Sequence, residues 1–181
     1  EWLGQPLHAV AFMTGHGHEN WHPDPEFYYK KGGGPLFDMG PYYLTALVNL
    51  LGPVSRVTGT ASISFNERII RSNPKFGERI KVEVPTHVQA LMEFASGVQA
   101  MMIMSFDVWA ANLPRIEIFG TRASLSVPDP NQHGGIVKIG RAKDIWETVP
   151  LTHGYSEPIR GIGVAEMAYA LKSGKINRAS G

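Results

Sequence analysis

The sequence predicts an α+β domain, an open and predominantly antiparallel β-sheet with helices packed on one face. Within 86–109 and within 115–127, two strand-like segments are joined by a tight turn, which is typical of antiparallel hairpins. Helical spacing of apolar residues is confined to 42–51 and 163–173. Many short strands and few helices therefore indicate one sheet with a single helical layer.

Length and composition favour one domain and exclude several classes of partner. At 181 residues the chain is long enough to bury a sizeable core. Its 17 Lys and Arg are balanced by 16 Asp and Glu, without the basic block that tracks a phosphate backbone. It has no cysteine, which excludes a disulfide framework and any cysteine-ligated metal site. No apolar run reaches membrane-spanning length, so we expect a soluble, cytoplasmic protein without nucleic-acid or membrane partners.

In chain order, the first strand is the apolar segment 7–13, and residues 54–65 form a long strand of β-branched and small residues. Residues 66–83 carry charges, a proline and a glycine, which indicates an irregular hairpin. The two hairpins of the sheet follow. Two short outer strands are then expected at 136–140 and 146–151.

Both faces of the middle of the sheet are apolar. One face is formed by alternate residues of two neighbouring strands: Val88, Ala90, Met92 and Phe94, then Val98, Ala100, Met102, Met104 and Phe106. The opposite face of the second strand carries Met101 and Ile103. Helices around 42–51 and 159–173 are expected to cover one face, which leaves no helix for the other. Unless a loop covers it, this second face is expected to bind another protein surface, which methionine side chains suit.

The segment 32–52, GGGPLFDMGPYYLTALVNLLG, joins a glycine run to an apolar helix. Apolar residues recur at three- and four-residue steps after Pro35, and Gly52-Pro53 ends the helix. Pro41 interrupts this pattern, because a proline inside a helix removes a hydrogen bond and clashes with the preceding turn. The helix is therefore either kinked at Pro41 or begins there, since proline is tolerated at a first helical position.

Asp38 and Tyr42 are four residues apart, so one continuous helix would place a carboxylate and a phenol on one face. If the helix begins at Pro41, the two side chains still converge. The alternative is that Asp38 caps the helix N-terminus. Tyr42 and Tyr43 would then be packed aromatics with their hydroxyls at the surface.

The loop after the first strand is dense in histidine, with His16, His18 and His22 in GHGHENWHPDPEF. Three imidazoles at this spacing are a candidate metal site if their rings converge, and otherwise belong to a polar loop. The loop leads directly to the Asp38 segment. Trp21 and His22, with Phe27, are therefore candidates to line a substrate pocket.

The glycine run at 32–34 allows the backbone to pass close to a bulky group and to adopt positive φ. It equally suits a flexible connection to the helix. A phosphate cradle of the P-loop type is disfavoured, because no Lys-Ser pair follows the glycines. The string 161–166 is no dinucleotide fingerprint either, since Glu166 stands where the third glycine belongs.

Segments covering nearly the whole chain resemble, in order, the second domain of the Gfo/Idh/MocA oxidoreductases. Besides the segment 32–52, the resembling segments are GQPLHAVAFM, WHPDPEFYYKKGGG, IEIFGTRASLSV and RGIGVAEMAYALKSG. The signature of that domain is a glycine pair or triplet, an acid, a glycine two residues later, and a histidine four residues after the acid. Here the acid is Asp38, the glycine is Gly40, and Tyr42 occupies the histidine position.

The resemblance implies the fold of the C-terminal domain of glyceraldehyde-3-phosphate dehydrogenase. Residues 1–181 would form a single substrate-binding and oligomerisation domain. The chain does not begin with Met, and we expect it to be part of a longer protein whose nucleotide-binding Rossmann domain precedes it. The implied cofactor is NAD or NADP, bound mainly by that absent domain. The implied partners are a small-molecule substrate and further copies of the chain, which meet through the open sheet face.

The reaction that the resemblance implies is hydride transfer between nicotinamide and a hydroxyl or carbonyl carbon of a sugar, polyol or related cyclic compound. Asp38 and Tyr42 are then the catalytic candidates. Trp21, His22 and Tyr43 are the substrate-binding candidates. Gly33 and Gly34 are candidates to contact the cofactor. We expect no metal, and we expect this chain alone to be inactive without its nicotinamide site.

Such chemistry requires a group that takes or gives the hydroxyl proton. An isolated phenol, with a pKa near 10, donates a proton more readily than it accepts one near neutrality. The family supplies a neighbouring lysine from the absent domain, and most members have histidine where Tyr42 stands. Tyr43 is an alternative working hydroxyl. Two other classes stay open: a non-catalytic, sheet-mediated assembly module, and a metal-dependent enzyme using His16, His18 and His22.

Overall fold

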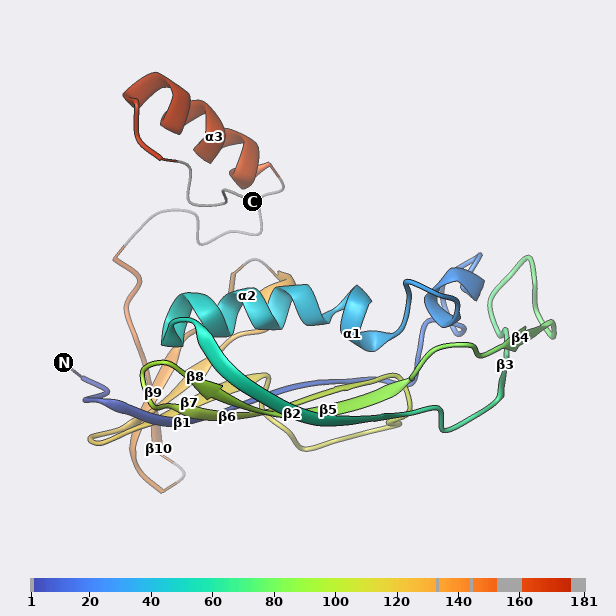
Figure 1. The fold of residues 1–181 in the computed structure, drawn as a ribbon, viewed down its shortest axis with the longest axis horizontal. Helices are drawn as coiled ribbons and strands as arrows, with labels where there is room; N and C mark the ends of the chain where they lie inside the picture. The colour runs from blue at the N-terminus through green and yellow to red at the C-terminus, as the bar shows by residue number, and fades with distance from the viewer. Residues whose placement is uncertain (1, 133, 144, 153–160, 177–181) are drawn as a thin grey trace.

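The computed structural model describes residues 2–132, 134–143, 145–152 and 161–176. Its main feature is an eight-stranded sheet in the order β10-β9-β8-β7-β1-β6-β5-β2 (Figure 1). The strands are β1 (Pro6–Thr14), β2 (Val54–Ser62), β5 (His87–Phe94), β6 (Gln99–Ser105), β7 (Ile116–Gly120), β8 (Ser124–Val127), β9 (Lys138–Ala142) and β10 (Ile145–Thr148). A separate two-stranded sheet pairs β3 (Glu67–Ile69) with β4 (Arg79–Lys81).

The sheet is mixed, with β1 parallel to β6 and all its other neighbouring strands antiparallel. The predicted α+β fold with a predominantly antiparallel sheet is therefore confirmed. The turn between β5 and β6 contains Gly97 with φ +87°, a conformation that favours glycine. The second strand of this hairpin ends at Ser105, four residues before the expected end.

The helical layer on one sheet face consists of α1 (Pro35–Asp38) and α2 (Gly40–Leu51), which run along the sheet in Figure 1. Most predicted inward residues of β5 and β6 lie in the core with the buried side of α2, whereas Val88 and Ala90 are half-buried. That core includes Tyr43, Leu47, Leu51, Met92, Phe94, Ala100, Met102 and Met104. Apolar area removed from water by this packing is the main stabilising contribution to such a fold.

The opposite sheet face exposes apolar side chains. Leu91 and Met101 are paired across β5 and β6, and their side chains are 61% and 42% exposed. Val10 of β1 is the next residue in this row, because it pairs with Met101. This open face, defined by Val10, Leu91 and Met101, has the apolar character that the sequence predicted.

The C-terminal helix α3 (Ile162–Ser173) forms where expected and ends at Gly174, whose φ is +67°. It does not cover the sheet, and that expectation was wrong. Figure 1 shows α3 apart from both sheet and α2. Val164 and Leu171 on its apolar side are 71% and 85% exposed, while Ala170 is buried. Amphipathic spacing predicts a helix with an apolar side but does not identify its packing partner.

No helix among the described residues is long and apolar enough to cross a bilayer.

Candidate functional site

Asp38 lies at a break between two helices. α1 ends at Asp38 and α2 begins at Gly40, so the chain is neither one kinked helix nor a helix that starts at Pro41. Pro41 is the second residue of α2, where its missing N–H costs no intrahelical hydrogen bond. No side chain caps α2, so the alternative in which Asp38 is its N-cap is wrong. The carboxylate is therefore available for another role.

The carboxylate of Asp38 faces an imidazole from the loop after β1. His18 Nε2 lies 3.4 Å from Asp38 Oδ2, and the side chains of these residues are 15% and 26% exposed. Asp38 Oδ2 is buried without a hydrogen-bond partner among the described residues. Burial raises the pKa of Asp38, because the charged form loses hydration. The loop and the helix break thus place two titratable groups against each other.

The His18 ring is held by aromatic neighbours. It stacks on Tyr28 with ring centroids 3.8 Å apart, and its centroid is 4.7 Å from that of Phe106, which it meets edge-on. Burial lowers the pKa of His18 to about 4, an effect that Glu19 opposes and His22 reinforces. His18 is therefore neutral near neutral pH, with one ring N–H to donate.

Trp21 contacts the His18 ring, and His22 lies next to Trp21. The Trp21 ring centroid is 5.3 Å from that of His18 and 5.3 Å from that of His22. Trp21 is 63% exposed, whereas His22 is half-buried and its Nδ1 accepts from the Asp24 N–H at 3.0 Å. The two predicted substrate-binding residues therefore form an aromatic rim beside His18.

Tyr42 and Tyr43 have opposite environments on α2. Tyr42 is 39% exposed, while Tyr43 is fully buried. The Tyr43 hydroxyl donates to Asp129 Oδ1 at 3.1 Å, and burial raises the pKa of Tyr43. A side chain in this position has no surface to offer a substrate. We therefore leave Tyr43 out of the proposed site. It is a packed aromatic, as the alternative expected, but its hydroxyl is bonded to Asp129 and the residue is fully buried, not at the surface.

Gly33 and Gly34 serve the packing of the chain. The N–H of Gly33 donates to Lys30 O and that of Gly34 donates to Tyr28 O, so neither is available to a phosphate. A Cβ on Gly33 would lie 2.5 Å from Phe27 O. At Gly34, whose φ is +85°, an added Cβ would lie 2.8 Å from Pro85 O. The close passage expected of the glycine run is confirmed at both residues and positive φ at Gly34, and the group that is passed closely is the protein's own backbone.

The three loop histidines do not converge on one point. His16 stacks on Trp109 with centroids 3.4 Å apart, while His18 stacks on Tyr28. Among the residues that the structure describes, no three histidines or carboxylates form a group able to hold a metal ion. This geometry does not support the alternative of a metal-dependent enzyme that uses His16, His18 and His22.

A buried ion network anchors the loop, and sequence reasoning missed it. Arg68 Nη1 donates to Glu19 Oε1 at 2.9 Å, and Nη2 donates to Phe106 O at 2.9 Å and to the Asp107 carboxylate. The Tyr29 hydroxyl donates to Glu19 Oε2. These partners lie far apart in sequence, so no local spacing reveals them. The only available signal was charge within segments otherwise expected to be loops.

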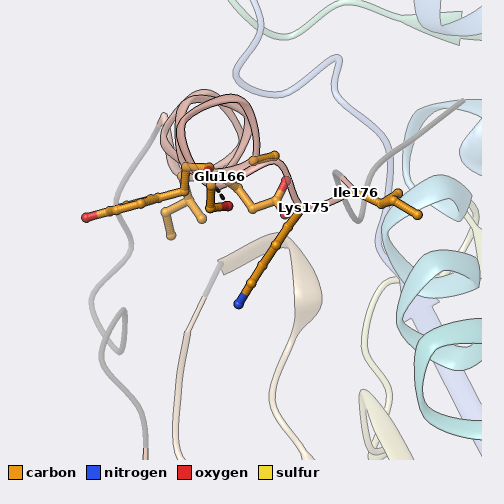
Figure 2. A pocket seen from close by; sticks show the side chains of 7 residues that line it. Glu166, Lys175 and Ile176 are labelled. Carbon is orange, nitrogen blue, oxygen red and sulfur yellow. Dashed lines mark hydrogen bonds between the residues drawn. The ribbon is translucent and has the colours of Figure 1, made fainter.

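A hollow beside α3 lies apart from Asp38. A cavity of about 450 Å³ is bounded by one side of α3 and the residues after it (Figure 2). Glu166, Lys175 and Ile176 line it. Its walls come from a helix that does not pack on the sheet, and Asp38 does not line it. We therefore place the candidate site at Asp38 and not in this hollow.

Several solved structures that match this fold are oxidoreductases. Levoglucosan dehydrogenase, in a complex with NADH and L-sorbose, matches with a TM-score of 0.73 and 20% identity, over 99% of this chain and 52% of that one. An aldose-aldose oxidoreductase from Caulobacter crescentus, complexed with glycerol, matches with a TM-score of 0.67 and 18% identity, over 97% and 48%. An NAD-binding oxidoreductase from Klebsiella pneumoniae matches with a TM-score of 0.62 and 25% identity, over 82% and 40%. The chain therefore spans about half the length of these proteins.

No curated protein matches the sequence. Residues 1–126 match the family model of the GFO/IDH/MocA C-terminal domain. This match covers most of the chain, including the Asp38 segment, the loop histidines and strands β1 to β7. The chain belongs to the GFO/IDH/MocA C-terminal domain family.

Proposed function

We propose that this chain is the substrate-binding and oligomerising half of an NAD(P)-dependent oxidoreductase. The full-length protein would move a hydride between nicotinamide and a hydroxyl or carbonyl carbon of a sugar, polyol or related cyclic compound. Family membership supports this reaction class, and similar folds occur in proteins solved with NADH, with L-sorbose and with glycerol. The observation that carries the proposal is Asp38, a partly buried carboxylate with an unpartnered oxygen at a helix break.

In this proposal Asp38 and Tyr42 act on the reacting hydroxyl. Oxidation of a hydroxyl carbon releases a proton, and reduction consumes one, so a side chain must hold that proton near the oxygen. The Tyr42 phenol is our candidate for this group, on the exposed side of the first turn of α2. The Asp38 carboxylate, one turn earlier in the chain, would orient the hydroxyl or polarise the phenol.

Trp21 and His22 would contact the rest of the substrate. The C–H faces of a sugar ring are apolar, and an exposed indole offers a flat apolar surface beside a polar N–H. Trp21 has this exposure, and His22 lies next to it. A rim of this kind orients a ring while its hydroxyls face Asp38.

The nicotinamide would be held by residues outside this chain. Gly33 and Gly34, the residues expected to contact it, use their N–H groups within the chain and do not fit a phosphate site. NAD or NADP, when bound, supplies or receives the hydride. This chain's own residues would bind the substrate, orient the hydroxyl and hold its proton. We accordingly propose that the chain alone is inactive.

The open face of the sheet is our candidate for contact between copies of the full-length protein. Leu91 and Met101 lie side by side across β5 and β6 and are exposed. An apolar sheet face that is left uncovered favours association, because burial removes its area from water. If the protein has no activity, a sheet-mediated assembly module is the second candidate function, and this face is the observation that favours it.

The test is steady-state turnover of the full-length protein, across sugars and polyols with both nicotinamides, beside the Tyr42→Phe variant. The substitution removes the hydroxyl and keeps the ring, so the packing of α2 is preserved. We expect kcat to fall about 100-fold or more, in the range reported for loss of a general acid or base. Unchanged turnover in Tyr42→Phe would exclude the proton role of this residue. Absence of turnover in the wild type would favour the assembly module.

A further inference from the structure

The contact between His18 and Asp38 joins segments that lie 20 positions apart in the sequence. His18 comes from the loop after β1, and Asp38 ends α1. The two approach to 3.4 Å through Nε2 and Oδ2. Asp38 Oδ2 has no hydrogen-bond partner among the described residues, although a buried carboxylate oxygen without one is costly. The imidazole N–H is the donor at hand.

The structure fixes the position of His18 before any substrate binds. Tyr28 stacks on one face of its ring, and Phe106 meets the ring edge-on. Its backbone carbonyl accepts the N–H of Trp21 at 3.2 Å and that of His22 at 2.9 Å. The next residue, Glu19, is tied to the buried guanidinium of Arg68. A ring that is held in this way is pre-organised to donate in one direction.

The surroundings of His18 favour a neutral imidazole. Burial has the largest effect on the pKa of His18 and lowers it. Of its neighbours in the loop, Glu19 raises this pKa and His22 lowers it. Burial raises the pKa of Tyr28, and the nearby charge of Asp38 adds to this by disfavouring a phenolate. The charge of Arg68 is balanced by its ion pairs with Glu19 and Asp107. The neutral imidazole then serves Asp38 as a hydrogen-bond donor and not as a counter-ion.

We propose that His18 is a positioning residue, which donates its Nε2–H to Asp38 Oδ2 and thereby keeps the Asp38 carboxylate ionised and aimed at the substrate hydroxyl. This inference rests on the proposed function, because it assigns Asp38 a substrate. The proposal adds His18 to the site. This residue lies outside the segment 32–52, in the loop that Arg68 anchors through Glu19. In this proposal the histidine-rich loop supplies a hydrogen-bond donor to Asp38 and does not bind a metal.

The test compares His18→Phe with His18→Gln in the full-length protein. Phenylalanine keeps the stack on Tyr28 and removes the donor, whereas glutamine keeps an N–H and cannot titrate in this range. A hydrogen bond to a charged group shifts its pKa by about one unit. For His18→Phe we expect the acid limb of the kcat/KM profile to move up by about one pH unit. We expect His18→Gln to restore most of the wild-type profile.

His16→Phe is the matched control, since His16 lies in the same loop but stacks on Trp109. Its acid limb is expected at the wild-type pH. An unshifted acid limb in His18→Phe would overturn the positioning role. Equal loss at every pH in both His18 variants, with folding intact, would overturn it too and make His18 the proton-transfer group itself.

A second readout does not depend on turnover. Nitrogen-15 spectra of the histidines in the full-length protein report which ring nitrogen is protonated. We expect His18 to carry its proton on Nε2 in the wild type, and we expect Asp38→Asn to change that signal. A proton on Nδ1 would overturn the pair. If no nicotinamide turnover is found, the proposed function fails on that result, while the spectrum still decides whether His18 donates to Asp38.

Discussion

Arg68 Nη1 donates to Glu19 Oε1 at 2.9 Å, and their side chains are 5% and 4% exposed. This contact joins β3 to the loop that carries His18. Removing one partner of a buried pair leaves the other charge unpaired, which typically costs 3–5 kcal/mol. We therefore expect Arg68→Met to lower the free energy of unfolding by about 3–5 kcal/mol, as measured by urea denaturation.

The exposed pair of Arg79 with Glu67 is the control for Arg68. Its atoms lie 2.8 Å apart, but the side chains are 68% and 53% exposed, so water screens the interaction. Arg79→Met is expected to change the free energy of unfolding by about 1 kcal/mol or less. Equal effects of the two substitutions would show that the buried network does not anchor the loop.

Asp38→Asn is expected to stabilise the protein at neutral pH. Burial raises the pKa of Asp38 above its ordinary value of 3.8, so the folded state binds its proton more tightly than the unfolded state. The aspartate is then harmless while both states are protonated and becomes destabilising as pH rises through the raised pKa. The gain in Tm from Asp38→Asn should be absent below about pH 4 and grow toward pH 7.

Asp24→Asn is the control with the opposite sign. Asp24 is exposed, and its hydrogen bond from Lys75 holds its pKa below the usual range. Such a group stabilises the fold above its unfolded pKa, so its removal cannot raise Tm at neutral pH. Thermal unfolding scans from pH 3 to 8 compare the two variants. A falling Tm for Asp38→Asn at pH 7 would contradict the account of Asp38 as a carboxylate whose pKa is raised by burial.

Gly33→Ala is expected to destabilise the fold by about 1–3 kcal/mol without changing affinity for the nicotinamide. The added methyl would meet Phe27 O at 2.5 Å, which forces the backbone to shift. Gly15→Ala is the control, because nothing lies within 4 Å of its Cβ position. Tm measures the first effect and cofactor titration of the full-length protein the second. Weakened NAD(P) binding with an unchanged Tm would return Gly33 to the cofactor site.

Met101→Lys is expected to weaken the oligomer of the full-length protein. The side chain lies on the open face beside Leu91, so a charge there would be buried without a partner if this face meets another copy. Phe76→Lys, at a residue 71% exposed near the β3–β4 hairpin, is the control. Light scattering after size exclusion gives the mass. An unchanged mass for Met101→Lys would exclude the open face as the interface.

The sequence was most informative where the signal is local. Alternation on β5 and β6 predicted which residues lie inward, because adjacent strand positions face opposite sides of a sheet. Glycine at positions 32–34 correctly indicated positive φ and close passage. The signature segment directed attention to Asp38, which stays a predicted site residue, and the helix break falls at Met39 and not at Pro41.

Contacts between distant segments were not predictable from the sequence. The parallel pairing of β1 with β6, the approach of His18 to Asp38 and the anchoring of Glu19 by Arg68 all depend on the topology of the sheet. Tyr42 and Tyr43 show the same limit at short range. Both were candidates by type, and only the orientation of α2 separates an exposed phenol from one that donates to Asp129.

The most direct test of the Asp38 site is the kcat of the full-length Asp38→Asn variant, measured with the best substrate of the wild type at pH 7. Asparagine has the shape of aspartate but neither its charge nor its capacity to accept from two donors. We predict a fall in kcat of about 100-fold or more, together with an unchanged or higher Tm. Wild-type kcat in this variant would contradict the placement of the reaction at Asp38.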